Sequence, residues 1–525
     1  MAIKQLLSVC LLACTSLANP LPRSSSINST TCNGQNYIYE SLAGYGFTPS
    51  NSRDEFGDTA GGIGSSAAID PTSWKKSSEG VYTGILWALP DRGWNTEGTL
   101  NYQPRVHKFA ITFTPDPSAS ASSRASPNLQ LEYLDSVRFS DPAGNPLTGL
   151  DPDFTPPYLS FQVMGQLASA TYTGDGFGGN GTGGSRVSGD TEGLVLNADG
   201  SFWVSDEYGA YIFRFHPTGK LLSAIAPPDA VLPRRNDTIS FNANSPPRYD
   251  PDRKISPGKP KSGRSNNQGL EGLTASPDGS TLYALLQSAA AQEGGNGDAN
   301  DARRYTRLFQ YDVSDPTSPV YEAEYVVPLP LYGKDDKVAA QSEIKFISDT
   351  QFLILARDSG AGHGQGPNNT KSAYRHADIF DISAATNIKG AHYDCANCSI
   401  ASSEGDLKDS IIPATYCSWL DYNVNSELDK FGLHNGGADD NGLLNEKWES
   451  LALVPVEPES GDGWQDWGSQ DEYFLFSLSD NDFITQDGYM KGGELQYSDE
   501  SGYDLLNQVL VFKIKLPKGS KPRLG

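Results

Sequence analysis

Apolar and polar residues alternate along this chain in short runs that recur in a fixed order. Each copy opens with Glu-Gly-Leu or a close relative; a turn, a second apolar run and a third, strictly alternating run follow. Alternation with a period of two residues predicts β-strands with one buried face. The first runs begin at Glu192, Glu271, Glu343 and Glu449, with a counterpart at Gly61-Gly62-Ile63. The second runs span 84–89, 202–205, 282–286, 352–356 and 473–478, and the third span 105–113, 211–215, 307–313, 378–382 and 509–514.

These five copies indicate one repeated antiparallel unit, which predicts a β-propeller because each small sheet buries both faces only against its neighbours. We expect an all-β fold, a single propeller of about six or seven antiparallel blades over residues 35–525, with long loop insertions. Only five copies are clear, so the blade number stays open. Two stacked β-sandwiches are the alternative fold, but they would not explain the recurring strand order. The 54 Gly and 34 Pro residues suit tight turns and argue against an all-helical fold.

The N-terminus has the pattern of a secretory signal peptide over residues 1–18. Lys4 precedes an apolar stretch at 6–13, and Ser16-Leu17-Ala18 forms the small-apolar-small end of a cleavage site. Residues 19–34 then form an N-terminal segment before the propeller. No later segment approaches the roughly 20 apolar residues of a membrane helix. We therefore expect a secreted, extracellular protein with no membrane segment.

Four cysteines remain after the signal peptide: Cys32, Cys395, Cys398 and Cys417. An even number in an exported chain predicts two disulfides. We expect Cys417 to pair with Cys395 or Cys398 and the other to pair with Cys32. A zinc site at the CxxC pair is the alternative, but it lacks a second close pair of ligands. Glycosylation sequons at Asn28, Asn180, Asn236, Asn368 and Asn397 fit export and predict a glycoprotein.

The charge balance restricts the partners. The chain has 40 Lys and Arg against 64 Asp and Glu, a formal net charge of −24. Such a field repels phosphate backbones and anionic lipid surfaces, which argues against nucleic-acid and membrane partners. We expect a monomer that acts on a small-molecule, carbohydrate or phosphoester substrate.

The repeat also predicts where acidic side chains gather. In an antiparallel hairpin the start of the first strand and the end of the second lie side by side. The first strands start with Glu, and the second strands end in polar clusters: Asp91-Arg92-Gly93, Asp206-Glu207, Gln287, Arg357-Asp358 and Asp480-Asn481-Asp482. We therefore expect eight acids to line one face around the central axis: Glu192, Glu271, Glu343, Glu449, Asp91, Asp206, Asp358 and Asp480.

An ordered set of short motifs resembles the phytase-like family, also described as esterase-like activity of phytase. The motifs are Asp190-Thr191-Glu192-Gly193-Leu194, Phe202-Trp203-Val204-Ser205-Asp206-Glu207-Tyr208-Gly209, Asn267-Gln268-Gly269-Leu270-Glu271-Gly272-Leu273, Ile354-Leu355-Ala356-Arg357-Asp358 and Asp480-Asn481-Asp482-Phe483. They span about residues 55–515. The resemblance implies a secreted propeller that hydrolyses phosphoesters or carboxyl esters, and it assigns neither a substrate nor catalytic residues.

Crowded carboxylates share protons, pair with arginine, or bind a hard cation such as Ca²⁺ through six to eight oxygens. A divalent cation at this mouth would polarise a phosphoester while an unligated carboxylate activates water. The expected cation ligands are Glu192, Glu271, Glu343, Glu449, Asp91, Asp480 and Asp482. The candidate catalytic residues are Asp206, Glu207, Arg357, Asp358, His363 and Arg92. For each acid the structural alternative is a hydrogen bond to backbone amides or a turn cap.

Other catalytic motifs are weaker. Arg375-His376 lacks the continuation of a histidine acid phosphatase, and no Gly-x-Ser-x-Gly elbow occurs. Asp439-Asp440-Asn441-Gly442 lacks EF-hand spacing. His363 in a glycine-rich loop could reach the mouth, but an exposed loop histidine is the simpler interpretation.

Two classes of function remain at this stage. The first is a secreted ester or phosphoester hydrolase with a cation at the acidic mouth. The second is a non-catalytic propeller that binds a carbohydrate or protein partner, with Trp94, Trp464 and Trp467 as stacking surfaces.

Overall fold

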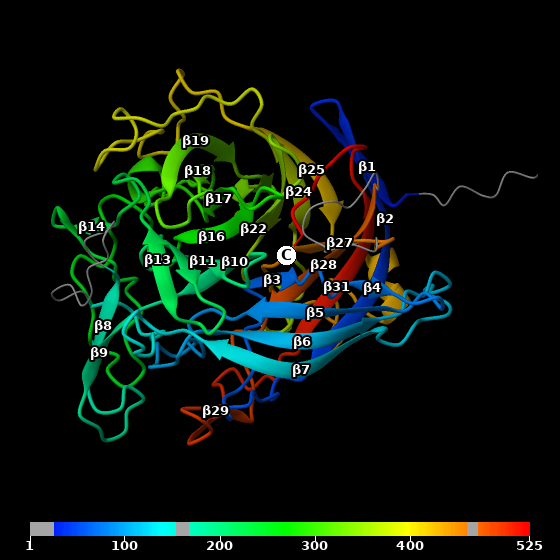
Figure 1. Ribbon diagram of the computed structural model, residues 1–525, viewed down its shortest axis with the longest axis horizontal. Helices are drawn as coiled ribbons and strands as arrows, with labels where there is room; N and C mark the ends of the chain where they lie inside the picture. Colours follow the sequence, from blue (N-terminus) through cyan, green and yellow to red (C-terminus); the bar gives the residue numbers. More distant parts are fainter. Residues whose placement is uncertain (1–25, 154–166, 459–470, 525) are drawn as a thin grey trace, which may run out of the picture.

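The computed structural model describes residues 26–153, 167–458 and 471–524. The expected signal peptide, residues 1–18, lies outside the described residues. Figure 1 shows sheets arranged around a common centre, the architecture of a single β-propeller, so the predicted all-β fold is confirmed. None of the helices in the described ranges is long and apolar enough to cross a membrane.

The ring has five blades, and the expected six or seven is wrong. The first four blades each contain four consecutive main strands. They are β3 (Ser66–Ile69), β5 (Tyr82–Leu89), β6 (Arg105–Phe113) and β7 (Leu129–Arg138); β10 (Thr191–Leu196), β11 (Phe202–Asp206), β12 (Ile212–Phe215) and β13 (Leu221–Ile225); β16 (Leu270–Ala275), β17 (Thr281–Leu286), β18 (Tyr305–Asp312) and β19 (Val320–Pro328); and β22 (Ala340–Phe346), β23 (Gln351–Arg357), β24 (Arg375–Asp381) and β25 (Thr415–Asp421).

The fifth blade joins the two ends of the chain. It contains β27 (Ala452–Pro455), β28 (Glu472–Asp480) and β31 (Asn507–Lys515) from the C-terminal part, and β2 (Gln35–Thr48) and β1 (Asn28–Cys32) from the N-terminal part. β2 pairs with β31 along its length, from Ile38 opposite Lys515 to Thr48 opposite Asn507. The ring is therefore closed by backbone hydrogen bonds between the first and last long strands.

The insertions do not supply further blades, because they form short hairpins and isolated segments. The hairpins are β8 (Ser169–Tyr172) with β9 (Gly184–Val187), β14 (Arg234–Arg235) with β15 (Thr238–Ile239), β20 (Leu331–Tyr332) with β21 (Lys337–Val338), and β29 (Gly488–Met490) with β30 (Leu495–Tyr497). The helical segments are η1 (Ala291–Glu293), α1 (Asn425–Leu428) and η2 (Asp429–Phe431). β4 (Lys75–Lys76) and β26 (Lys447–Trp448) instead pair with β5 and β28 and so extend the first and fifth blades. Two-residue strands bury too little surface to make a blade.

The hydrophobic core is divided among the junctions between blades. Five large clusters of buried apolar residues each combine residues from two neighbouring blades. At the junction of the first and second blades, for example, Phe139 stacks on Phe215 with ring centroids 4.3 Å apart. Each blade is thus stabilised by burying both faces, as the sequence repeat predicts.

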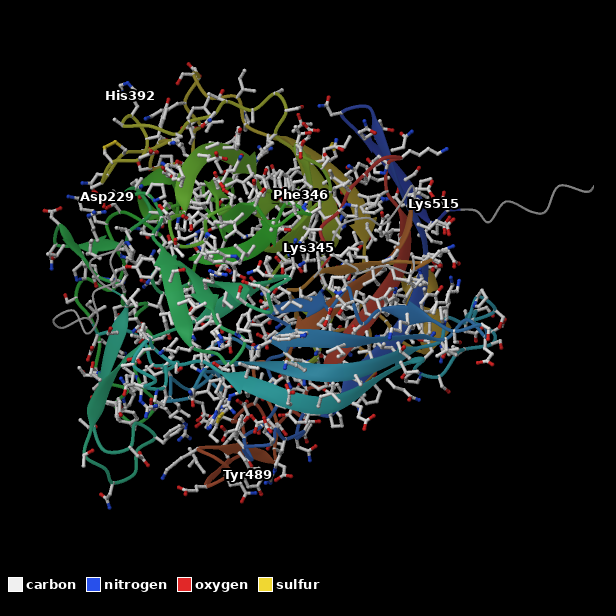
Figure 2. All side chains as sticks on the ribbon, viewed as in Figure 1. Asp229, Lys345, Phe346, His392, Tyr489 and Lys515 are labelled. Atoms are coloured by element: carbon white, nitrogen blue, oxygen red, sulfur yellow. A yellow bond between two sulfur atoms is a disulfide. The ribbon has the colours of Figure 1, made fainter. Side chains whose placement is uncertain are left out.

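The C-terminal tail lies at the centre of the ring (Figure 1). The Arg523 backbone amide donates to the Phe346 carbonyl at 3.1 Å, and its guanidinium donates to the Pro277 carbonyl at 2.9 Å. Figure 2 shows Lys345 and Phe346 near the middle of the molecule and Tyr489 at its edge. Phe346 is the last residue of β22, so the tail lies where the inner strands end.

The disulfides differ from the expected pairing. Cys32 is bonded to Cys417, and Cys395 is bonded to Cys398. β1 lies against β25 of the neighbouring blade, which brings the Cα atoms of Cys32 and Cys417 to 5.8 Å. A tight turn, in which the Cys398 amide donates to the Cys395 carbonyl at 2.8 Å, brings the other two cysteines together. The expectation failed because local spacing does not reveal which strands are neighbours.

We predict that the two disulfides contribute unequally to stability. Cys32–Cys417 has a sequence separation of 385 residues, whereas Cys395–Cys398 has one of 3. A longer closed loop restricts the unfolded chain more, so Cys32→Ser with Cys417→Ser should lower the free energy of unfolding by about 2–5 kcal/mol. The matched control, Cys395→Ser with Cys398→Ser, should lower the free energy of unfolding by less. Urea unfolding measures both, and equal losses would contradict this prediction.

Candidate functional site: an acidic channel mouth

The acids gather where the inner strands begin. In the third blade Leu270 pairs with Leu286 and Gly272 pairs with Leu285, so Glu271 is the extra residue of a β-bulge. In the second blade a bulge between Thr191 and Leu194 contains Glu192. Bulges redirect a side chain out of the regular alternation. Glu192 and Glu271 thus leave the regular alternation at equivalent points of neighbouring blades, and the charge of Glu271 acts on Glu192.

The fourth blade breaks this pattern. Gln341 pairs with Ala356 and Glu343 with Leu355, so the extra residue of its bulge is Ser342. The expected equivalence of Glu343 with Glu271 is therefore wrong by one residue. In a strand, a shift of one residue places a side chain on the opposite face.

Glu343 instead lies deeper in the channel as a link between blades. Its carboxylate accepts hydrogen bonds from Ser66 Oγ at 2.6 Å, from the Ile344 amide at 2.9 Å and from the Leu273 amide at 3.2 Å. Burial raises its pKa to about 7, against the effect of the Lys345 charge. Its hydrogen bonds connect the first, third and fourth blades.

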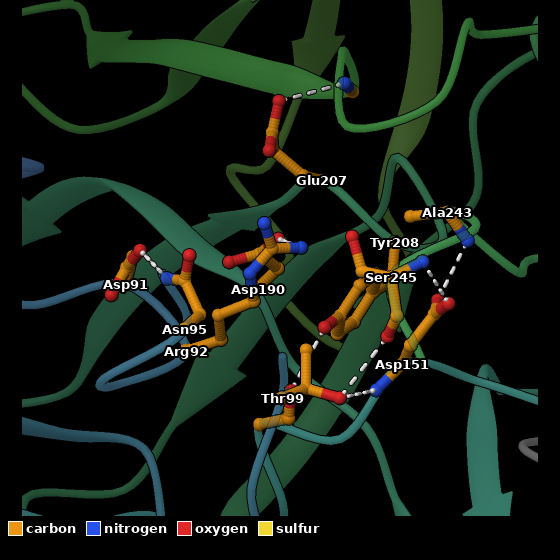
Figure 3. Close-up of polar contacts among 12 residues, drawn as sticks. Asp91, Arg92, Asn95, Thr99, Asp151, Asp190, Glu207, Tyr208, Ala243 and Ser245 are labelled. Atoms are coloured by element: carbon orange, nitrogen blue, oxygen red, sulfur yellow. Dashed lines mark hydrogen bonds and ion pairs between the residues drawn. The ribbon is translucent and has the colours of Figure 1, made fainter. Parts of the chain in front are cut away.

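One carboxylate group at the mouth contains Asp190, Glu192 and Glu207. Each offers an oxygen, and the three oxygens lie within 4.8 Å of one another. Arg92 Nη1 lies 3.0 Å from Asp190 Oδ2, and Figure 3 shows the two side chains next to each other. Glu207 accepts a hydrogen bond from the Gly269 amide at 3.2 Å, which ties this group to the third blade.

A second group contains Asp91, Asp480 and Asp482, whose oxygens also lie within 4.8 Å of one another. Lys447 Nζ lies 3.0 Å from Asp480 Oδ2 and 2.8 Å from Asp482 Oδ1. Asp91 is held by the Gly93 amide at 3.0 Å and by Asn95 Nδ2 at 2.8 Å.

Glu449 joins the two sides of the mouth. Its carboxylate lies 3.6 Å from Lys447 Nζ and forms an ion pair with Arg357 of the fourth blade. The ion pair of Glu449 with Arg357 thus bridges the fourth and fifth blades on this face.

Burial raises the pKa values of the acids in the two carboxylate groups, and repulsion between acids adds to the effect. Burial raises the pKa of Glu192 well above its usual range, and the charges of Glu271 and Glu207 raise it further. The pKa of Glu207 rises to about 8 by burial and by the Asp190 charge. The pKa of Asp91 is raised by burial and by the charge of Asp480. Like charges in a poorly solvated site favour protonation unless a cation is present.

The donor set fits a hard divalent cation. Carboxylate oxygens are the ligands that Ca²⁺ and Mg²⁺ prefer. Asp190 Oδ1 and Glu271 Oε2 are buried without a hydrogen-bond partner among the described residues. Buried polar atoms are normally paired, so these oxygens are available as ligands. The group of Asp190, Glu192 and Glu207 fits better than the second group, where Lys447 already neutralises two carboxylates.

Two other candidates, Asp206 and Asp358, hold loops. Asp206 accepts hydrogen bonds from the backbone amides of Asp190 at 2.9 Å and Gly209 at 2.6 Å. Asp358 accepts from Ser372 Oγ and the Ala373 amide, each at 2.6 Å. Their carboxylates thus cap turns, which is the structural role that the sequence left open for each acid.

His363 is buried and not an exposed loop residue. Its Nδ1 lies 2.6 Å from Asp439 Oδ1, and Tyr503 donates to Asp439 Oδ2 at 2.8 Å. Among the described residues it has no hydrogen bond or ion pair with the acids of the mouth.

Two residues of the mouth were absent from the candidates, Asp190 and Lys447. Each lies two residues before a ring glutamate, Glu192 or Glu449. That spacing was the available signal. Lys447 is the more informative omission, because a basic residue in an acidic ring sets which carboxylates remain unneutralised.

The aromatic surface expected of a binding module is not present at Trp94. Trp94 is 2% exposed and stacks on Tyr497 with ring centroids 4.0 Å apart. Trp464 and Trp467 lie outside the described residues. Trp94 therefore belongs to the core of a surface loop.

Comparison with known proteins gives one family and one close relative. The family described as "Phytase-like: Esterase-like activity of phytase" matches residues 75–419. A protein of Arthroderma benhamiae, described as an uncharacterized secreted protein, is 52% identical over 471 residues, 88% of this chain and 90% of the relative.

Similar solved structures are distant. A luciferin-regenerating enzyme is 10% identical with a TM-score of 0.24 and covers 88% of this chain and 96% of its own. A protein from Lactobacillus plantarum is 10% identical with a TM-score of 0.28 and covers 84% of this chain and 87% of its own. Scores this low support no conclusion about this chain.

We predict that, in chelator, the free energy of unfolding falls as pH rises from about 5 to about 8. Glu207 has a folded-state pKa of about 8 against 4.5 when unfolded, so the folded state binds more protons in this window. Stability then decreases with pH, because deprotonation favours the unfolded chain.

Glu192→Gln removes one repelling charge and should reduce this pH slope, as measured by urea unfolding at several pH values. The control is Asp199→Asn, since Asp199 lies in the turn after β10 and pairs with Arg214. A slope that is the same in wild type and Glu192→Gln would contradict the assignment of this pH dependence to the acids of the mouth.

Proposed function

Since the chain belongs to the phytase-like family, we propose that it is a secreted hydrolase of phosphoesters or carboxyl esters that uses a divalent cation at the acidic channel mouth. The carboxylate group of Asp190, Glu192 and Glu207 carries the proposal. Its oxygens lie within 4.8 Å of one another, and burial excludes the solvent that would otherwise screen their repulsion.

Asp190, Glu192 and Glu207 would hold the cation, with Ca²⁺ favoured by their oxygen ligands. When bound, it would polarise the phosphoryl or acyl oxygen of the substrate. Glu271 lies next to this set, and Gln287 orients it by a hydrogen bond to Oε1. In this proposal Glu271 Oε2 would accept a proton from attacking water.

Arg92 and Arg357 supply fixed positive charge. Asp190 anchors Arg92, and Glu449 anchors Arg357, so neither side chain needs to reorganise when a negatively charged oxygen develops. Asp480 and Asp482 hold Lys447 in place on the other side of the mouth.

Export of the chain belongs to the same proposal. The close relative is described as secreted, and the structure contains two disulfides, which persist in oxidising compartments. The proposal includes glycosylation at the five sequon asparagines, which are at exposed positions: Asn28, Asn180, Asn236, Asn368 and Asn397.

We predict that Ca²⁺ raises the melting temperature of purified protein and supports hydrolysis of nitrophenyl phosphate or nitrophenyl acetate, and that chelator reverses both effects. A ligand that binds only the folded state stabilises it by mass action. Glu192→Gln with Glu207→Gln should weaken Ca²⁺ binding by more than about tenfold, since even residues that only orient a ligand contribute that much.

Asp199→Asn is the control and should bind Ca²⁺ as wild type does. Calorimetric titration measures binding, and the two nitrophenyl substrates separate phosphatase from esterase activity. Unchanged melting and full hydrolysis in chelator by the wild type and the double variant would overturn the proposal.

A further inference from the structure

The two disulfides of the described chain differ in how far solvent reaches them. Cys32 is fully buried, and Cys417 packs against the same apolar cluster. Cys395 is exposed and Cys398 is half-buried, in the insertion between β24 and β25. Figure 2 shows His392, which precedes Cys395 in this insertion, at the outer edge of the molecule. The Cys395–Cys398 disulfide is therefore the one that a molecule in solution can reach.

Hydrogen bonds outside the disulfide hold both ends of the CxxC turn. The Asp394 carbonyl, just before Cys395, accepts a hydrogen bond from the Ala230 amide at 3.0 Å. The Cys398 carbonyl accepts one from Gln292 Nε2 at 3.1 Å. The turn is thus fixed to the segments that follow β13 and β17. Opening the S–S bond breaks neither hydrogen bond, so the two sulfurs remain close enough to rejoin.

A buried ion pair supports the segment after Cys398. The Glu293 carboxylate accepts a hydrogen bond from the Ile400 amide at 2.9 Å and pairs with Arg307, and both charged side chains are completely buried. Displacing Ile400 would leave part of this carboxylate without a donor, which is costly in a buried site. The disulfide itself has a sequence separation of only 3 and restricts the unfolded chain little. The loop therefore owes its position to these contacts more than to the S–S bond.

We propose that Cys395–Cys398 is a thiol–disulfide exchange site for small thiols outside the cell. Exposed disulfides are more readily reduced than structural ones, and a site that keeps its two sulfurs together can be oxidised again. The exchange is independent of the proposed hydrolysis.

The position of Asn397 between the two cysteines decides the kind of thiol. Asn397 is exposed and begins one of the sequons. A glycan is bulky, so at this position it would exclude a protein partner while it admits a small molecule. The choice of a small thiol thus rests on the glycosylation proposed above.

The exchange takes two balanced steps. A thiolate from solution attacks Cys395 Sγ and forms a mixed disulfide, while the Cys395–Cys398 bond breaks with its electron pair on Cys398 Sγ, which takes a proton from water. A second thiolate attacks the outer sulfur, releases the oxidised small disulfide and leaves Cys395 as a thiol after protonation. Two small thiols are oxidised and one protein disulfide is reduced. The Ala391 carbonyl oxygen lies 3.9 Å from Cys398 Sγ and can accept a hydrogen bond from the new thiol.

Titration of the folded protein with glutathione near neutral pH tests the site. After alkylation, mass spectrometry should find Cys395 and Cys398 reduced at glutathione concentrations at least about tenfold below those that open Cys32–Cys417, with an unchanged circular dichroism spectrum. Oxidised glutathione should then restore the bond. Reduction of both disulfides together, or reduction only with loss of the folded spectrum, would overturn the inference.

Cys398→Ser and Cys395→Ser form a matched pair that separates the two sulfurs. With oxidised glutathione, the exposed Cys395 thiol of the first variant should form a mixed disulfide about tenfold faster or more than the half-buried Cys398 thiol of the second. Equal rates would overturn the assignment of Cys395 as the attacked sulfur.

Asn397→Gln tests the effect of the sequon and should exchange with glutathione as wild type does. Exchange by Asn397→Gln alone would overturn the site in the glycosylated protein. Reduction of wild type by the protein dithiol thioredoxin and not by glutathione would overturn the choice of a small thiol.

Discussion

Closure of the ring is the constraint on which the rest of the structure depends. The inner strands converge only if five blades complete a circle, and the pairing of β2 with β31 completes it with strands more than 400 residues apart in the chain. Neighbouring blades then share apolar clusters, which hold the starts of the inner strands at one mouth. Without this pairing, carboxylates from the second, third and fifth blades would have no reason to be neighbours.

Convergence of the strands also creates the electrostatic problem of the mouth. Burial raises the pKa values of Glu192, Glu207 and Glu271. The charges of Glu271 and Glu207 raise the pKa of Glu192 further, and the charge of Glu207 raises that of Glu271. Arg92 and Lys447 compensate only part of this charge. A fold selected for stability alone would place apolar residues here, since buried like charges destabilise it. The arrangement is instead typical of sites where stability is sacrificed for function.

The repeat in the sequence was enough to predict the propeller and where several of its acids lie, because strand alternation and hairpin geometry are local properties. Glu192, Glu271, Glu449, Asp91 and Asp480 lie where hairpin geometry places them. Glu343 does not, since a bulge changes direction by one residue and leaves little trace in the pattern. The blade number and the partner of Cys32 depend on which blades are neighbours, which is a property of the closed ring.

The C-terminal tail has a consequence for how distant blades are coupled. The Arg523 guanidinium donates to the carbonyls of Leu196 in the second blade and Pro277 after the inner strand of the third, and its amide donates to the carbonyl of Phe346 in the fourth. Glu343 likewise connects the first, third and fourth blades. The last residues of the chain therefore link the second and fourth blades, which are not neighbours in the ring.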